Sequence, residues 1–80
     1  MDWLEEMTAA IAEAAGLESA ELQLPVAVRD EILDLARIAS HASGERINAP
    51  LLCYALGIAV ASGRADLEAL ARTIRSRTNA

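Results

Sequence analysis

Few side chains in this sequence of 80 residues have the chemistry of catalysis. His41 is the only histidine and Cys53 the only cysteine, which argues against a zinc or disulfide scaffold. His41 precedes a predicted helix end, where it either serves as an acid–base group or anion contact, or simply finishes the helix. Cys53 lies in an uncharged segment, so we expect a buried, inert thiol. We predict no catalytic residues, no metal site and no bound cofactor.

The acidic residues do not form a catalytic pair by their spacing. Glu5–Glu6 and Asp30–Glu31 are adjacent in sequence, and neighbouring side chains on a helix point about 100° apart. Solvated helix faces explain these carboxylates better than a shared proton does. The glycines are scattered and form no phosphate-binding loop.

One loop is a candidate binding site. Residues 43–48 follow His41 and lead into a predicted helix, and helix N-termini attract anions. The candidate anion-binding residues are His41, Arg46 and Asn48. The alternative is a plain connecting loop in which Asn48 only caps the helix. A second arginine group, Arg72, Arg75 and Arg77, either binds an anion or complements the dipole of the last helix.

The elements that must position these residues all have helical spacing. The first predicted helix covers about residues 3–15, with Asp2 as its cap and Gly16 as its stop. Its apolar stripe consists of Leu4, Met7, Ile11 and Ala14. A linker over residues 17–24 contains a short helical turn near residues 19–21.

Two further amphipathic helices follow in the sequence. The second predicted helix begins at Pro25 and ends at Gly44. Its inward stripe consists of Val28, Ile32, Leu35, Ala39 and Ala42, and Ile38 is expected on the exposed side. The last predicted helix covers about residues 65–77, with Leu67, Leu70, Ala71 and Ile74 facing inward.

The helix predicted between them, at about residues 49–62, carries no charge. A helix that is apolar all round must be buried all round. Either the other helices surround it, or its outer face meets a second copy of the chain. Gly57 is unfavourable inside a helix, so we expect it to permit a close helix contact. The interface candidates are Leu51, Tyr54, Ala55 and Ile58. The sequence therefore predicts one all-α domain over residues 1–80, a compact four-helix bundle with a central apolar third helix.

Composition and charge narrow the functional classes. Apolar residues make up 54% of the chain and the net charge is −5, which excludes disorder and disfavours nucleic-acid binding. Residues 1–34 carry nine acidic residues and one arginine, and residues 35–80 carry three acidic residues and six arginines. The longest apolar run, residues 51–61, is shorter than the about 20 residues that cross a bilayer. We see no targeting segment, and one unpaired cysteine suits a reducing compartment, so we expect a cytoplasmic protein.

Three stretches of the sequence carry a family resemblance: MDWLEEMTAAIAEAAGL, LQLPV and EILDLARIASHASGERINAPLLCYALGIAVASG. The recurring features are Trp3-Leu4, Leu24-Pro25, His41, Arg46 and Ala49-Pro50-Leu51. Together they resemble a small helical domain of actinobacteria that is associated with the guanylyltransferases of molybdopterin cofactor synthesis. The resemblance implies an accessory role near molybdenum cofactor assembly, and it implies no catalytic residues.

Two functions remain open from the sequence. The favoured one is a noncatalytic helical interaction or accessory module, a homodimer that assists a molybdopterin guanylyltransferase-type protein and binds neither nucleic acid nor membrane. The alternative is a small ligand-binding or enzymatic protein that holds an anionic cofactor at the loop before the third helix. A cleft beside that loop would favour the alternative.

Overall fold

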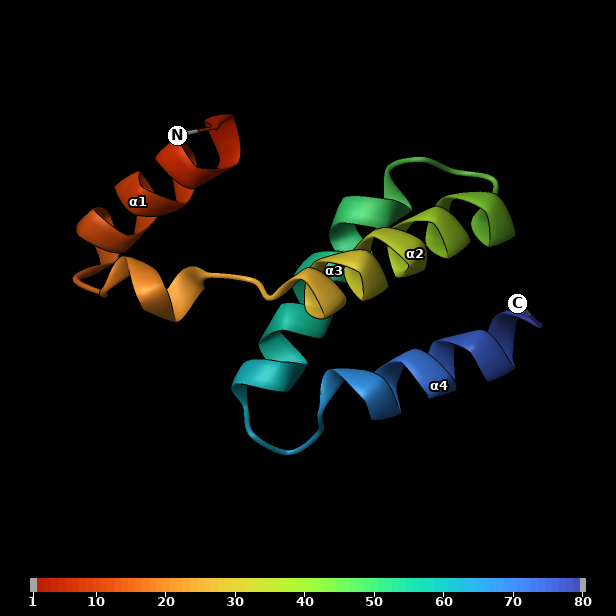
Figure 1. Ribbon diagram of the computed structural model, residues 1–80. Helices are drawn as coiled ribbons and strands as arrows, with labels where there is room; N and C mark the ends of the chain where they lie inside the picture. The colour runs from red at the N-terminus through yellow and green to blue at the C-terminus, as the bar shows by residue number, and fades with distance from the viewer. Residues whose placement is uncertain (1, 80) are drawn as a thin grey trace.

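The chain folds into four α-helices and one short 3-10 helix, as seen in a computed structural model that describes residues 2–79 (Figure 1). In chain order these elements are α1 (Trp3–Ala15), η1 (Ser19–Leu22), α2 (Val26–Ser43), α3 (Asn48–Ala61) and α4 (Leu67–Thr78). No β-strand occurs between residues 2 and 79. The prediction of an all-α fold with four helices is confirmed.

Short polar residues and glycines set most helix ends, which the sequence predicted at Asp2, Gly16 and Gly44 but not at Asp66, where α4 begins two residues later than expected. The Asp2 carboxylate accepts a hydrogen bond of 2.8 Å from the backbone N–H of Glu5 at the start of α1. Asp66 accepts an equivalent bond of 2.8 Å from Ala69 at the start of α4. Gly16 ends α1 in the left-handed region with a φ of 72°, which a side chain would disfavour. These contacts are local, and therefore the sequence alone specifies them.

The start of α3 differs from the prediction that Asn48 is its cap. Asn48 is already helical, and the preceding Ile47 has helical backbone angles without a side-chain cap. The backbone N–H of Asn48 donates to the carbonyl of Glu45 at 3.2 Å, and that of Ala49 donates to Arg46 at 3.1 Å. The turn before α3 thus satisfies these N–H groups by itself, and a side-chain cap is unnecessary.

The hydrophobic core lies among α2, α3 and α4, which we call the three-helix unit. Its buried residues are Leu35, Ile38, Leu56 and Ala71, with Leu52, Leu67, Leu70 and Ile74 packed against them. The prediction for α4 is therefore confirmed. The expectation that Ile38 faces solvent is wrong, because α2 contacts both α3 and α4 and so needs a wider apolar face than one stripe.

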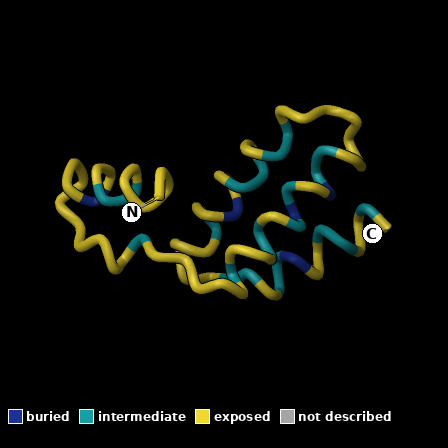
Figure 2. Tube along the Cα trace, turned by 45° about the horizontal axis from the view of Figure 1, so that its top comes forward, coloured by how far each residue is buried: buried dark blue, intermediate teal, exposed yellow. Residues whose placement is uncertain are grey.

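Helix α1 lies apart from the three-helix unit. It contacts only η1, with which it forms a unit that we call the arm, residues 3–22 (Figure 1). Figure 2 shows the same separation from a second direction, with almost the whole arm exposed. Only Ala12 of α1 is buried. The stripe of Leu4, Met7 and Ile11 is exposed, whereas a place inside a bundle would have buried it.

The chain exposes more surface than a compact domain of its mass. Its accessible surface is 6137 Å², against about 4,700 Å² expected for a folded monomer of this mass. Its radius of gyration is 13.7 Å, against about 12 Å for a compact chain of this length. The excess comes with the separated arm, because α1 leaves its own apolar stripe uncovered and contacts none of α2, α3 and α4.

Helix α3 is apolar but not surrounded. Helices α2 and α4 cover the face that carries Leu52 and Leu56, and Leu56 is the only buried residue of α3. Gly57 is exposed, and a Cβ built there meets no atom within 4 Å. The expectation that Gly57 permits a close helix contact is therefore wrong for the single chain.

Candidate functional site

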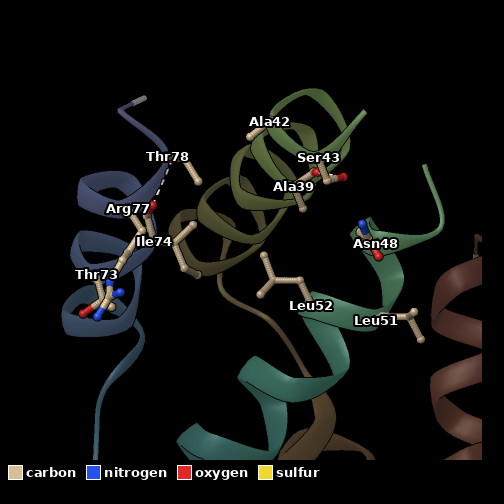
Figure 3. Close-up of a pocket in the computed structure, with 10 residues that line it drawn as sticks. All are labelled: Ala39, Ala42, Ser43, Asn48, Leu51, Leu52, Thr73, Ile74, Arg77 and Thr78. Carbon is tan, nitrogen blue, oxygen red and sulfur yellow. Dashed lines mark hydrogen bonds between the residues drawn. The ribbon is translucent and has the colours of Figure 1, made fainter. Parts of the chain in front are cut away.

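The outer side of α3 carries a continuous apolar surface. Leu51, Tyr54 and Ile58 are spaced i, i+3 and i+7, so they share one helix face, and their exposed fractions are 63%, 74% and 59%. Ala55 is exposed beside them. Figure 3 shows Leu51 pointing away from α4, whereas the next residue, Leu52, points toward it. We call these four residues the α3 face; they are the interface candidates that the sequence analysis singled out.

A second apolar surface lies on the arm. Leu4, Met7 and Ile11 repeat the same i, i+3, i+7 spacing on α1, and all three are exposed. We call them the α1 face. Helix α1 contacts η1, and its one buried residue, Ala12, lies about 100° around the helix from Ile11. Leu4 also lines a pocket with Ser19 and Leu22 of η1, so the α1 face borders this contact and still stays exposed.

The three anion-site candidates lie in the last turn of α2, in the turn that follows and at the first residue of α3. His41 and Arg46 are exposed, and Asn48 is half-buried. The N–H groups of Asn48 and Ala49 already donate to backbone carbonyls, and Pro50 has no N–H. The N-terminus of α3 therefore offers few backbone donors to an anion.

A groove of about 600 Å³ does lie beside this loop, between the ends of α2 and α4 and the start of α3 (Figure 3). Asn48 is the one anion-site candidate that lines it. Most of the lining is apolar or hydroxyl-bearing: Ala39, Ala42, Ser43, Leu51, Leu52, Thr73, Ile74 and Thr78, with Arg77 also present. This chemistry gives an anionic cofactor less support than it gives an apolar contact.

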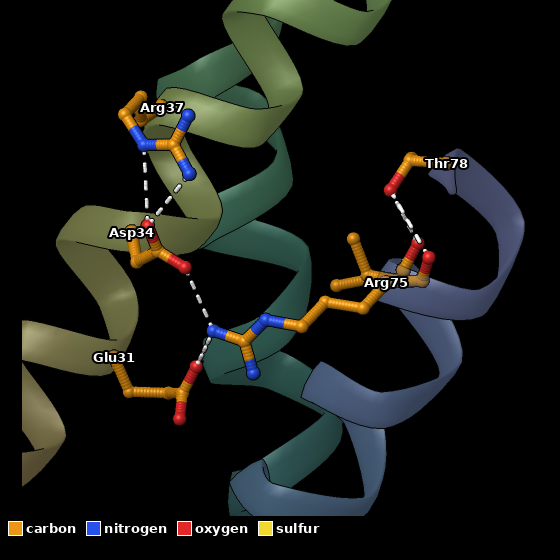
Figure 4. A network of polar contacts seen from close by, with 6 residues as sticks. Glu31, Asp34, Arg37, Arg75 and Thr78 are labelled. Carbon is orange, nitrogen blue, oxygen red and sulfur yellow. Dashed lines mark hydrogen bonds and ion pairs between the residues drawn. The ribbon is translucent and has the colours of Figure 1, made fainter. Parts of the chain in front are cut away.

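Arg75 forms an ion-pair network that the sequence analysis missed. Its guanidinium donates to Glu31 and, at 2.8 Å, to Asp34 on α2 (Figure 4). Arg37 pairs with the same Asp34 at 2.9 Å. The pKa of the Asp34 carboxyl is lowered, first by the hydrogen bond from Arg75 and then by that from Arg37. The i, i+3 spacing of Glu31 and Asp34 indicates that both carboxylates share one face of α2, but only the packing of α4 on α2 brings Arg75 to them.

The other two arginines of α4 have separate surroundings. Arg72 pairs with Glu68 on its own helix at 3.5 Å, and Arg77 lines the groove. The arginine group thus does not act as one anion-binding face. Instead, Arg75 joins α4 to α2.

The remaining candidate for chemistry is Cys53, which the sequence analysis expected to be buried. Cys53 is half-buried, and burial raises the pKa of its thiol, which disfavours the reactive thiolate. Residues 2–79 contain no group of three or more His, Cys, Asp or Glu side chains that could hold a metal ion. Within the same residues, no helix combines the length and the apolar character that a membrane crossing requires.

The fold and its surface define a small all-helical domain with two uncovered apolar faces among residues 2–79. The chain belongs to the family DUF6457, a domain of unknown function, whose match covers residues 1–80. Searches of the curated proteins and of the solved structures found no match. This match supports the coarser part of the expected resemblance, a small domain family without an assigned function.

Proposed function

We propose that this domain is a noncatalytic interaction module that acts as a homodimer, with the α3 face in its interface. The observation that carries the proposal is the exposure of Leu51, Tyr54 and Ile58 on one uncharged helix face. Single exposed apolar residues are normal on a monomer. A contiguous apolar patch instead marks a site of association.

The surface area supports a second copy as the occupant. The chain exposes about 1,400 Å² more than a compact monomer of its mass, from 6137 Å² against about 4,700 Å². A standard interface buries about 800 Å² on each partner, and obligate homodimers bury more. A second copy that covers this excess surface would bury an area typical of homodimer interfaces.

Sedimentation equilibrium at micromolar concentration tests the proposal. The expected mass is about twice the 8.5 kDa of one chain. Ile58→Glu places a charge in the α3 face and should return the mass to that of one chain. Leu33→Glu is the matched control, because Leu33 is exposed to 61% and Ile58 to 59%, but Leu33 stands on α2 between Asp30 and Arg37.

Each outcome decides the proposal. A wild-type mass of 8.5 kDa over the whole concentration range would overturn it. Equal loss of mass in both variants would also overturn it, because the effect would then come from added charge and not from the α3 face. Circular dichroism of both variants establishes that the helices persist.

We further propose, on the sequence resemblance alone, that the dimer assists a molybdopterin guanylyltransferase-type protein in the cytoplasm. The support is the set of shared features at Trp3-Leu4, Leu24-Pro25 and Ala49-Pro50-Leu51. Titration calorimetry of the domain with such an enzyme tests this role. Absence of binding would remove the molybdenum role and leave the homodimer proposal in place.

A further inference from the structure

We infer that the homodimer is held by exchange of arms: the α1 face of each copy packs on the α3 face of the other. This inference rests on the proposed homodimer and specifies its contacts. Both faces are apolar and exposed in the single chain, and both use the i, i+3, i+7 spacing. The helices are also matched in length, with 13 residues in α1 and 14 in α3, or about 20 Å each.

Such a contact would stabilise the helix of the arm. An isolated helix of 13 residues is marginal in water, and α1 gains only the burial of Ala12 against η1. A dimer built from α3 faces alone would leave Leu4, Met7 and Ile11 in water. A contact between α1 and the partner's α3 covers both faces at once.

The distribution of charge favours this pairing over a contact between two arms. Residues 2–24 carry six acidic residues and no basic residue, and none of these acids forms an ion pair among the described residues. Two arms packed on each other would bring twelve like charges together, six from each copy, which is unfavourable. Helix α3 has no charged residue, so an acidic helix meets no repulsion there.

The ends of α3 also complement the arm. Arg46 precedes α3 and Arg64 follows it, both are exposed, and neither forms an ion pair within residues 2–79. The glutamates of α1 lie off its apolar stripe, at positions 5, 6 and 13. The two arginines that flank the α3 face would therefore lie near the glutamates that flank the α1 face.

The connection between arm and three-helix unit favours the partner over the chain's own α3. Gln23 and Pro25 are extended, with φ/ψ of −75°/139° and −55°/151°. Pro25 fixes its own φ, and it restricts the preceding Leu24 to extended conformations. Helix α1 makes no contact with its own α3 beyond this extended segment, so the α1 face is available to a second copy.

Disulfide cross-linking between single-cysteine variants tests the inference. One variant carries Met7→Cys and another carries Tyr54→Cys, each with Cys53→Ala, which removes the native thiol. The two are refolded together, oxidised mildly and analysed by mass spectrometry. Exchange of arms predicts the mixed disulfide above its statistical proportion, because Met7 then faces the partner's α3 and not another Met7.

The other pairings give distinct products. A predominant homodisulfide of the Tyr54→Cys variant would overturn the exchange and leave a homodimer through α3. The double variant Met7→Cys, Tyr54→Cys tests for a closed monomer, in which α1 packs on the α3 of the same chain. In that case an intrachain disulfide forms and the mass stays that of one chain. That product would overturn the exchange, whereas a covalent dimer of the double variant whose peptide map joins position 7 to position 54 supports it.

Sedimentation equilibrium of Met7→Glu gives a second measurement on the intact chain. The expected result is a fall to 8.5 kDa, with Leu33→Glu again unchanged as the control. A Met7→Glu variant that still dimerises would overturn the exchange without affecting the proposed function. A wild type that sediments as one chain would overturn both.

Discussion

The arm and the three-helix unit both contain well-formed helices but differ in tertiary packing. Helix α1 has a hydrogen-bonded Asp2 cap, a left-handed Gly16 end and a regular apolar stripe. Helix α2 has no side-chain cap, yet it contains the two buried residues Leu35 and Ile38. Good caps therefore specify that a helix forms, but they do not specify what it packs against.

The two regions also use their charges differently. In the three-helix unit, Arg75 reaches from α4 to Glu31 and Asp34 on α2. In the arm, the acidic residues make only local contacts, such as the bond of 2.8 Å from the backbone N–H of Glu18 to Glu21. Ion pairs thus join two helices of the three-helix unit, whereas the acidic groups of the arm are left for a partner.

The largest expected effect is at the centre of the three-helix unit. Leu35→Ala should lower the free energy of unfolding by about 2–5 kcal/mol, because Leu35 is 0% exposed and its removal leaves a cavity. Leu33→Ala on the same helix should stay within about 0.5 kcal/mol, because that side chain is exposed. Urea denaturation measures both, and equal effects would contradict the core position.

Hydrogen exchange compares the two regions directly. In the dissociated Ile58→Glu variant, amides of α1 should exchange at least about 100-fold faster than those around Leu35, because the short arm helix opens without unfolding the core. In the wild-type dimer this difference should shrink. Equal protection of α1 and α2 in the dissociated variant would show that the arm is stable without a partner.

A smaller effect is expected at Gly57. Gly57→Ala should raise the free energy of unfolding by about 0.4–1 kcal/mol, because alanine favours the helix and the added Cβ meets no atom within 4 Å. Thermal denaturation measures the change. Destabilisation would show that a partner helix approaches Gly57 in the dimer.

The Arg75 network should make stability depend on pH in the acidic range. Because the pKa of Asp34 is lowered in the folded state, its contribution is present above the ordinary carboxyl range and is lost as pH falls through the lowered value. Asp34→Asn should therefore flatten the loss of stability between about pH 5 and about pH 3. Asp30→Asn, an exposed carboxylate on the same helix, should leave that loss unchanged.

The smallest effect is expected at His41. This side chain is exposed in the last turn of α2 and makes no hydrogen bond with the described residues. His41→Asn should change the free energy of unfolding by less than about 0.5 kcal/mol, and it should leave the dimer mass unchanged. A larger loss would place His41 in a contact that forms only between copies.

The sequence predicted helix boundaries well where one residue and its near neighbours decide them. Asp2 and Gly16 flank α1, and both form hydrogen bonds with backbone groups of its own first and last turns. The prediction that Asn48 caps α3 was wrong, because carbonyl groups of the turn before α3 accept hydrogen bonds from the helix N–H groups. A cap residue indicates a helix start only where the preceding turn does not already pair the first N–H groups of the helix.

Contacts between helices could not be predicted in the same way. The burial of Ile38 and the ion pair between Arg75 and Glu31 depend on how α4 lies against α2, and residues 31 and 75 are 44 positions apart. The sequence marked Leu51, Tyr54, Ala55 and Ile58 correctly as members of one helix face, since helical spacing fixes that. Whether a face is covered depends on the direction of neighbouring helices.

What the sequence by itself determined is therefore the set of helices, most of their ends and the apolar face of each. These follow from spacing and from hydrogen bonds over three or four residues. The tertiary structure alone decided that the α1 face and the α3 face both stay uncovered within one chain. The reason is physical: hydrophobic burial is nondirectional, so a stripe of apolar residues does not specify its own partner, and an extended segment separates the arm from the three-helix unit.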